Sequence, residues 1–367
     1  MYPSFIVEYG VAPHHLSKEV FIGIVKWLRE TRVEAKHTGR KLEADALKIV
    51  INRIYGALND TMDYLYDPEC TYTVTINLQL LLCGLIEAFE LNNFDVLSAN
   101  TDGLLVRLPL NRQGVFKHIC NEWSVYSKLD LETEKFEKYC RSAVNDYIAV
   151  GYGFYDALQE YNRCGVWIDS KSNTYTTRQA IEDKFIKFKG YFLQDPEYNK
   201  GFVYPVVKKA LKEYFLYGVD ITEFIRNYIN TSRTAIYDYC FSQKVAGKYT
   251  TIYKTVRDGK PVYIKCQKHN RFYICKSGGG AITKAIVPDS DNIAYGDDIS
   301  GIVVEEEKSL VADQRVALFN DYEYKEDYNL NYGFYINEAY KILYGNGKIG
   351  KGERRGINNN SNNLFGW

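Results

Sequence analysis

Two long helical patterns separated by a short break constrain this chain most. The first runs from Leu16 to Lys36, with Ser17 placed to cap its first turn, and the second runs from Lys41 to Leu58. His37, Thr38 and Gly39 interrupt the pattern, so the two segments are expected to form an antiparallel helical pair. The apolar side chains expected on the inner face of the first helix are Val20, Ile24, Trp27 and Leu28.

A third helix is expected from Val74 to Leu91, because this segment is apolar on nearly every side. Such a helix is expected inside the fold, beneath the hairpin that follows it. In that hairpin, Val96 and Leu97 are expected to form a strand and Ser98 to Gly103 a tight turn. The returning strand is expected from Leu104 to Val106.

The rest of the chain is mixed in character. A strand is expected in Lys138 to Val150, two helices joined at Gly218 in Val203 to Ile229, and a basic, β-rich segment in Tyr249 to Ile286 that ends in KSGGGAITK. The tail from Lys348 is polar and Gly-rich, as is typical of disordered ends.

Length and composition set wide limits. A chain of 367 residues fits two or three modules, and a net charge of zero excludes attraction to a polyanion through an overall basic field. Its 8 cysteines form no CxxC pair, which favours reduced thiols. No apolar run approaching the roughly 18 residues of a membrane helix and no signal peptide is apparent, so the protein is expected to be soluble and intracellular.

Asp102 stands at the tip of the predicted hairpin, followed by Gly103. A carboxylate raised on such a tip is a suitable ligand for Mg2+, which keeps waters and substrate phosphates as its other ligands. If Asp102 stood alone, an ordinary Asx-turn residue would be the better explanation of a single aspartate in a turn.

Three residues of the second predicted helix suggest a partner for Asp102. Lys48, Asn52 and Tyr55 are spaced four and three apart, and therefore share one helix face that could meet phosphate, sugar and base. Arg32 and Lys36 are also four apart, and an antiparallel return could bring Lys48 beside them to neutralise a triphosphate. The alternative is an ordinary solvated helix surface.

Three segments resemble, in order, the three polymerase motifs of family B DNA polymerases, particularly those of bacteriophages. They are MYPSFIVEYG, KIVINRIYG and LSANTDGLLV. The first resembles the end of D-x-x-S-(L/M)-Y-P-S. The second resembles K-x-x-x-N-S-x-Y-G, with Arg53 where Ser is usual, and the third resembles D-T-D-S, with Asn100 and Gly103 at its ends.

The resemblance implies roles for these residues. Asp102 matches the indispensable metal ligand and catalytic carboxylate, and Tyr2 matches the ring under the incoming sugar that excludes a 2′-hydroxyl. The residues that match the nucleotide site on the two fingers helices are Arg32, Lys36, Lys48, Asn52 and Tyr55.

A looser likeness continues downstream. NDY at Asn145 to Tyr147 resembles the K-x-Y element that touches the primer strand, with Asn145 replacing Lys. Two later segments look like parts of a thumb that grips the backbone of duplex DNA. They are KFKGYF at Lys187 to Phe192 and the segment that carries Lys265, Lys268 and Arg271. A basic β-surface without a DNA partner is the alternative for that segment.

The resemblance implies an α+β fold with right-hand polymerase architecture that lacks the exonuclease domain. The expected modules are residues 1–10 as the end of motif A, 11–58 as helical-hairpin fingers, 59–155 as palm, 156–345 as thumb and C-terminal region, and 346–367 as a flexible tail.

The implied chemistry is two-metal nucleotidyl transfer from a dNTP to a primer 3′-hydroxyl on primer-template DNA. Of the two Mg2+ ions, one is shared with a carboxylate that the family pattern places upstream of Met1. We therefore expect a truncated or split fragment that alone is weakly active or inactive. Its expected partner is an N-terminal polymerase/exonuclease polypeptide. If a phage encodes the chain, its expected location is the host cytoplasm. A non-catalytic subunit that binds primer-template DNA is the alternative; a reverse transcriptase is a weaker one.

Overall fold

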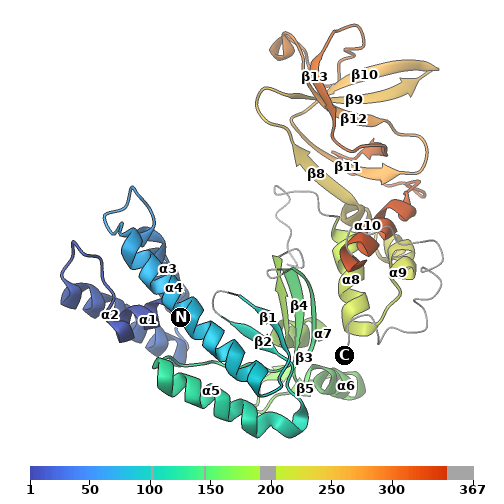
Figure 1. Ribbon diagram of the computed structural model, residues 1–367. Coiled ribbons are helices and arrows are strands. Elements are labelled where there is room, and N and C mark those ends of the chain that lie inside the picture. The colour runs from blue at the N-terminus through green and yellow to red at the C-terminus, as the bar shows by residue number, and fades with distance from the viewer. Residues whose placement is uncertain (101–102, 144–145, 191–203, 345–367) are drawn as a thin grey trace. The chain divides into compact units, whose positions relative to one another are not determined.

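The structure is a computed structural model that describes residues 1–100, 103–143, 146–190 and 204–344. The chain divides into two compact units, Met1–Glu134 and Lys135–Trp367 (Figure 1). This division falls between the boundaries expected after residues 58 and 155, so the assignment of fingers, palm and thumb stays a prediction.

The first unit is mainly helical. Its helices are α1 Tyr2–Tyr9, α2 Lys18–His37, α3 Lys41–Leu58, α4 Pro68–Leu91 and α5 Gln113–Ser127. Its strands are β1 Val96–Ala99 and β2 Leu104–Val106, and a short 3-10 helix covers Leu110–Arg112. The predicted helical pair is confirmed: Ser17 caps α2 by accepting from the Val20 amide, and α3 has the expected bounds.

The expected inner face of α2 is largely wrong. Phe21, Val25 and Leu28 are buried, whereas Val20, Ile24 and Trp27 are 61%, 52% and 61% exposed. The helix carries two neighbouring apolar stripes with the same i, i+4, i+7 spacing, so periodicity alone does not decide which stripe packs inward. Only Leu28 of the four predicted residues lies in the core.

Helix α4 begins at Pro68, six residues before the expected start at Val74, and packs through one face only. Val74, Leu78, Leu85 and Phe89 lie in the core of the first unit, against which β1 and β2 also pack. The opposite face is exposed, which corrects the expectation of a helix buried on all sides. The residues that make up this exposed apolar row are Tyr72, Ile76, Leu80 and Leu91.

By length and composition alone, α4 could also cross a membrane. This corrects the sequence expectation that no apolar run is long enough. A helix that packs one face into a protein core has the same composition, and α4 does so here.

The N-terminus of α4 is fixed by Asp67. This carboxylate is 6% exposed and accepts hydrogen bonds from the Cys70 amide at 2.9 Å and from both the amide and the ring of His14, at 2.8 and 2.9 Å. Burial opposes ionisation of Asp67, but these donors outweigh it and lower its pKa to about 2. The same contact raises the pKa of His14. Asp67 thus ties the loop before α2 to the longest helix of the unit.

The second unit combines helices with antiparallel sheets. Its helices are α6 Phe154–Cys164, α7 Arg178–Phe185, α8 Pro205–Tyr217, α9 Ile221–Asn227 and α10 Tyr332–Tyr344, with short 3-10 segments at Tyr228–Thr231, Ala235–Tyr239 and Ser290–Asn292. Its strands are β3 Phe136–Ala143, β4 Asp146–Gly151, β5 Trp167–Ile168, β6 Thr174–Tyr175, β7 Ile186–Lys189, β8 Cys240–Lys244, β9 Thr250–Arg257, β10 Lys260–Cys266, β11 His269–Cys275, β12 Ala281–Ile286, β13 Glu305–Ser309 and β14 Arg315–Leu318.

The strands form several sheets, in the orders β3-β4-β7, β10-β9-β12-β13, β14-β11-β8 and β5-β6. The β-rich character expected for Tyr249 to Ile286 is confirmed. The expected break between two helices is also confirmed, because Gly218 ends α8 in the left-handed region at φ +72.

The KSGGG segment is a tight crossing of backbones. A Cβ on Gly279 would lie 2.4 Å from the Val316 carbonyl oxygen, and one on Gly280 would lie 2.2 Å from that of Lys254. These glycines are therefore required by close packing of strands.

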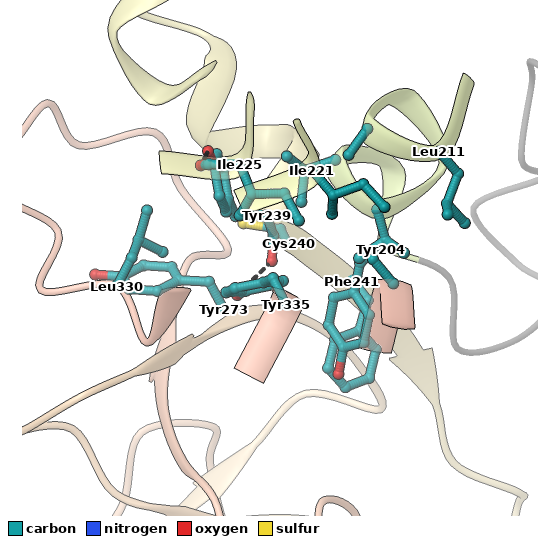
Figure 2. Close-up of a cluster of buried hydrophobic side chains, with 14 of the residues drawn as sticks. Tyr204, Leu211, Ile221, Ile225, Tyr239, Cys240, Phe241, Tyr273, Leu330 and Tyr335 are labelled. Atoms are coloured by element: carbon teal, nitrogen blue, oxygen red, sulfur yellow. Dashed lines mark hydrogen bonds between the residues drawn. The ribbon is translucent and has the colours of Figure 1, made fainter. Parts of the chain in front are cut away.

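Tyr335 of α10 lies at the centre of the second unit's core (Figure 2). Its hydroxyl donates to the Tyr239 carbonyl at 2.8 Å and accepts from the Ile274 amide at 2.9 Å, while the residue is fully buried. Burial raises the pKa of Tyr335 well above its ordinary value. A single phenol thus links α10 to β11 and to the segment before β8.

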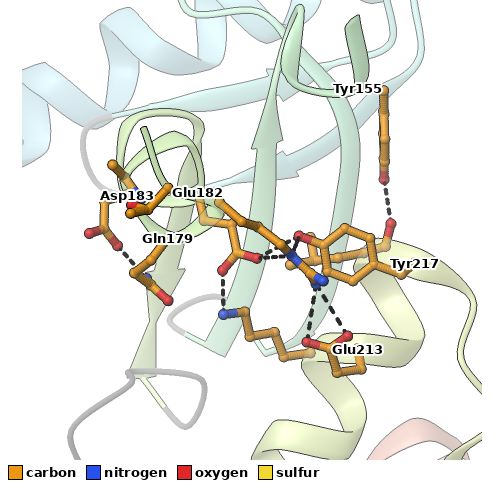
Figure 3. Close-up of polar contacts among 11 residues, drawn as sticks. Tyr155, Gln179, Glu182, Asp183, Glu213 and Tyr217 are labelled. Carbon is orange, nitrogen blue, oxygen red and sulfur yellow. Dashed lines mark hydrogen bonds and ion pairs between the residues drawn. The ribbon is translucent and has the colours of Figure 1, made fainter. Parts of the chain in front are cut away.

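Helices α7 and α8 are joined by a charged network around Glu182 (Figure 3). Glu182 is 2% exposed and accepts from Lys212, Arg178 and Tyr217. Burial opposes its ionisation, yet these donors lower its pKa. Because every partner is present, the buried charge is satisfied; removing one partner of such a pair costs about 3–5 kcal/mol.

We predict that Asp67→Ala lowers the free energy of unfolding by about 1–3 kcal/mol at pH 7, because α4 loses its cap and two donors lose their acceptor. The folded pKa of about 2 lies below the ordinary value, so the ionised form stabilises the fold. The difference from wild type should therefore persist at neutral pH and shrink as the pH falls from about 5 towards 2. Urea denaturation at several pH values measures it.

Asp45→Ala is the matched control, since Asp45 is exposed on α3, and it should change the stability by no more than about 0.5 kcal/mol. An Asp67→Ala effect as small as that of the control, or equal at pH 7 and at about pH 3, contradicts the assignment.

Candidate nucleotide and nucleic-acid interface

Tyr2 and Tyr55 form a parallel aromatic stack. Their ring centroids are 4.1 Å apart and their planes differ by 3°. The Tyr55 hydroxyl shares a 2.6 Å hydrogen bond with the Thr75 hydroxyl of α4. Two residues expected at the same nucleotide site, one on α1 and one on α3, are therefore in contact, with α4 as their support.

The predicted stripe on α3 continues from this stack towards solvent. Lys48 and Asn52 are exposed and Tyr55 is half-buried, as expected for residues four and three apart on one helix face. A cation, an amide and a ring thus follow one another along the helix.

Arg32 on α2 carries an orphaned donor. Its Nε is buried and has no hydrogen-bond partner in the described part of the chain. α2 ends at His37 and α3 begins at Lys41, so Arg32 and Lys48 lie within about 3 Å of the same height along the hairpin. An acceptor brought by a ligand would relieve the unpaired Nε, whose isolation costs about 1–3 kcal/mol.

Lys36 is less well placed than Arg32 to bind an anionic ligand. It is mainly exposed, and its nearest carboxylate is that of Glu132 at 3.9 Å. An exposed pair of this kind contributes about 0–1 kcal/mol, so it leaves the ammonium available to an anion.

Arg53 replaces the serine usual in the second motif, and the structure gives it a role that the sequence did not suggest. Its guanidinium donates to Asp60 at 3.1 Å and to Asp63 at 2.8 Å. The hydrogen bond to Asp60 and the charges of both carboxylates raise the pKa of Arg53. This residue fixes the turn after α3; the cluster of aspartates that follows was the available indication.

The hairpin β1–β2 has the predicted returning strand, and β1 extends to Ala99, two residues beyond the predicted strand. Ala99 pairs with Leu104, and the Asn100 amide donates to the Gly103 carbonyl at 3.0 Å to close the turn. Asp102, expected as catalytic residue and metal ligand, lies outside the described residues. Within residues 1–100, 103–143, 146–190 and 204–344, no group of three His, Cys, Asp or Glu side chains could hold a metal ion.

Of the expected DNA contacts near β4, Asn145 also lies outside the described residues. Tyr147 is half-buried on β4 and stacks on Tyr139 of β3, with centroids 5.0 Å apart and planes inclined by 29°. Lys189 of β7 pairs with Tyr147 in the sheet register, and its ammonium lies 5.9 Å from that ring. Lys189 was not singled out individually from the sequence.

The structure contradicts the expected role of Lys265 as a DNA contact. It is 6% exposed, and its ammonium donates to the Ser290 carbonyl and, at 2.6 Å, to the Ile293 carbonyl. These acceptors hold the charge inside the second unit, so Lys265 has no free ammonium for a phosphate. A cation flanked by aromatic residues looked like a surface contact, but strand register turns this one inward.

The other two expected contacts on this segment differ from Lys265. Lys268 is exposed, and Arg271 is half-buried with its guanidinium 4.9 Å from the Tyr237 ring. Both keep a charge that solvent can reach, so both stay predicted DNA contacts.

No protein-family model matches the chain. The chain is similar to DNA polymerase II of Escherichia coli (strain K12), at 32% identity over 77 residues. This match covers 21% of the chain and 10% of that polymerase, so the chain matches only about a tenth of its relative's length. It provides a distant link to family B DNA polymerases.

We predict that Lys265→Met lowers the free energy of unfolding by about 1–3 kcal/mol, because two buried carbonyls lose their donor. Lys268→Met should leave stability within about 0.5 kcal/mol of wild type, because Lys268 is exposed. Urea denaturation of the two matched variants measures this difference. Equal stability of the two variants contradicts the assignment.

Proposed function

We propose that this chain is the part of a template-directed DNA polymerase that holds the incoming deoxynucleoside triphosphate. The observation that carries the proposal is the contact between Tyr2 and Tyr55. These residues come from two of the three motif-like segments, and a nucleotide site requires both segments at one place.

Three further features support the same assignment. The helical hairpin α2–α3 brings Arg32 and Lys48 to similar heights, Arg32 has an unpaired donor, and the 77-residue match is to a DNA polymerase. Arg32, Lys36 and Lys48 would offset the charge of the triphosphate, and Asn52 would face the sugar or base. The activity of the whole enzyme is part of the proposal, because the chain matches a tenth of that relative's length.

In the proposed reaction, the primer 3′-hydroxyl oxygen attacks the α-phosphorus of the nucleotide. A new phosphodiester P–O bond forms, the bond from the α-phosphorus to the oxygen that bridges to the β-phosphorus breaks, the hydroxyl proton passes to solvent water, and pyrophosphate leaves with the bridging oxygen. Cations that hold the departing phosphates stabilise the charge that builds there. Tyr2, beneath the sugar, would exclude a ribonucleotide.

The described residues do not by themselves fit two Mg2+ ions, since they provide no group of three metal-ligating side chains. We propose that Asp102 would bind Mg2+ together with a carboxylate from another segment or polypeptide.

A non-catalytic polypeptide that holds primer-template DNA is the second candidate. Asn100 favours it, because this residue stands where the third motif usually carries an aspartate. The two candidates differ in what Asp102 does.

The first test is binding of a fluorescent dNTP to the chain, followed by anisotropy. Arg32→Ala should weaken binding by roughly 10- to 100-fold, the effect of losing a hydrogen bond to a charged group. Lys26→Ala is the control, because Lys26 is exposed on α2 and lies 4.0 Å from Glu30; it should leave the affinity unchanged. Failure of the wild-type chain to bind, or equal binding by Arg32→Ala, contradicts the nucleotide site.

Primer extension then separates the two candidates. The chain is combined with a polypeptide that supplies the family's upstream carboxylate, and Asp102→Ala is compared with Asp45→Ala. Lost extension with retained DNA binding supports the polymerase. Unchanged extension supports the DNA-binding subunit.

A further inference from the structure

Thr75 of α4 stands between Tyr55 and the backbone of its own helix in a chain of hydrogen bonds. The hydroxyl oxygens of Tyr55 and Thr75 are 2.6 Å apart, and the Thr75 hydroxyl donates to the Thr71 carbonyl at 2.8 Å. A threonine hydroxyl has a single hydrogen, so Thr75 has none left to donate to Tyr55. Tyr55 is therefore the donor of the bond between the two hydroxyls, and Thr75 is its acceptor.

This acceptor is held rigidly. The β-branch of Thr75 restricts its side chain to few rotamers, and the bond to the Thr71 carbonyl selects one of them. Thr71 is 6% exposed, and its own hydroxyl donates to the Asp67 carbonyl at 3.1 Å. Val74 and Leu78, on the core side of the helix, are 0% and 1% exposed. The Thr75 hydroxyl thus projects from a part of α4 that burial and hydrogen bonds fix in place.

The bond to Thr75 fixes the direction of the Tyr55 ring. Tyr55 is half-buried and packs at the edge of the core, so its packing alone leaves one side of the ring uncovered. A phenol held at its hydroxyl end cannot swing about its side-chain torsions without breaking that bond. Because the Tyr2 and Tyr55 centroids are only 4.1 Å apart and their planes differ by 3°, Tyr2 cannot tilt towards α3 unless Tyr55 moves first.

This support matters for the choice of sugar. In the proposed function Tyr2 lies beneath the sugar of the nucleotide, and a ribonucleotide differs there from a deoxynucleotide by one hydroxyl. A ring excludes that hydroxyl by collision only while the ring keeps its place, because a ring that yields leaves room for the extra oxygen. Selective sites accordingly depend on neighbouring residues that lock the rotamers of the side chains in contact with the ligand.

We propose that Thr75 positions the ring that selects the sugar: by accepting from Tyr55, it holds Tyr2 where a 2′-hydroxyl collides with it. Thr75 acts through Tyr55 and Tyr2, so it is a positioning residue and not a catalytic one. It lies outside the three motif-like segments, which end at Gly10, end at Gly56 and begin at Leu97. The inference rests on the proposed function, since it concerns the same nucleotide site.

The experiment compares two competitors that differ only in the 2′-hydroxyl. A fluorescent dNTP bound to the full chain is displaced by dATP or by ATP, and anisotropy gives the ratio of the two affinities. Thr75→Val keeps the branched shape and removes the acceptor. The preference for dATP over ATP should fall by roughly 2- to 12-fold, the factor that corresponds to the net contribution of one hydrogen bond.

Two variants of the same helix serve as controls. Thr73→Val makes the same chemical change at a half-exposed position two residues away, which faces another side of α4, and should keep the wild-type ratio. Thr75→Ser keeps the hydroxyl and should also keep the ratio. Thermal unfolding of each variant measures stability separately. If Thr75 only joined two helices, Thr75→Val would weaken dATP and ATP in the same proportion and leave their ratio unchanged.

A double-mutant cycle tests whether the bond itself is responsible. Tyr55→Phe removes the donor and should lower the ratio as much as Thr75→Val does. The double variant should lower it no further, because both single changes remove the same bond. Reductions that multiply in the double variant would show two independent effects and would overturn the proposal.

The remaining outcomes separate this inference from the proposed function. A wild-type ratio in Thr75→Val, or an equal fall in Thr73→Val, rejects the role of Thr75; the nucleotide site stands if Arg32→Ala still weakens dATP binding. Equal binding of dATP and ATP by the wild-type chain rejects it too, because there is then no sugar selection to support. If the wild-type chain binds neither nucleotide, the proposed function fails and this inference fails with it.

Discussion

The first unit depends on the point where Tyr2, Tyr55 and Thr75 meet. The ring stack joins α1 to α3, and the hydrogen bond between hydroxyls joins α3 to α4. Buried apolar residues lie around this point, among them Ile6 of α1 and Leu58 of α3. An aromatic pair of this kind contributes about 0.5–1.5 kcal/mol beyond its buried area. Its larger effect is to fix the exposed stripe of α3 relative to the start of the chain.

The helices of this unit were largely predictable, because periodicity and capping residues agree. Ser17 begins α2 as expected, and α3 matches its predicted bounds. The early start of α4 was also encoded, since Asp67 followed by Pro68 is a common helix beginning. The inner face of α2 was not predictable, because its two stripes are equally apolar and only their packing partners distinguish them.

The candidate site shows a similar limit. Spacing places Lys48 and Asn52 on one face of α3, but the contact between Tyr2 and Tyr55 could be expected only from the resemblance to a family. Lys265 was misassigned because the sequence does not fix strand register, and register decides whether a lysine meets solvent or buried carbonyls. Lys189 was overlooked for the same reason, since its neighbour Tyr147 lies far away in sequence. Asp102 and Asn145 lie outside the described residues, so their predicted roles stay predictions.

The exposed row on α4 has a consequence for handling the protein. Tyr72, Ile76, Leu80 and Leu91 offer apolar area to water along one side of a long helix. The chain has no net charge at pH 7, so no long-range repulsion keeps two molecules apart. Contact between such rows releases roughly 25 cal/mol for each Å² of apolar area removed from water. Concentrated solutions near neutral pH should therefore associate through this helix, and colloidal stability will improve most when the pH is moved away from the isoelectric point.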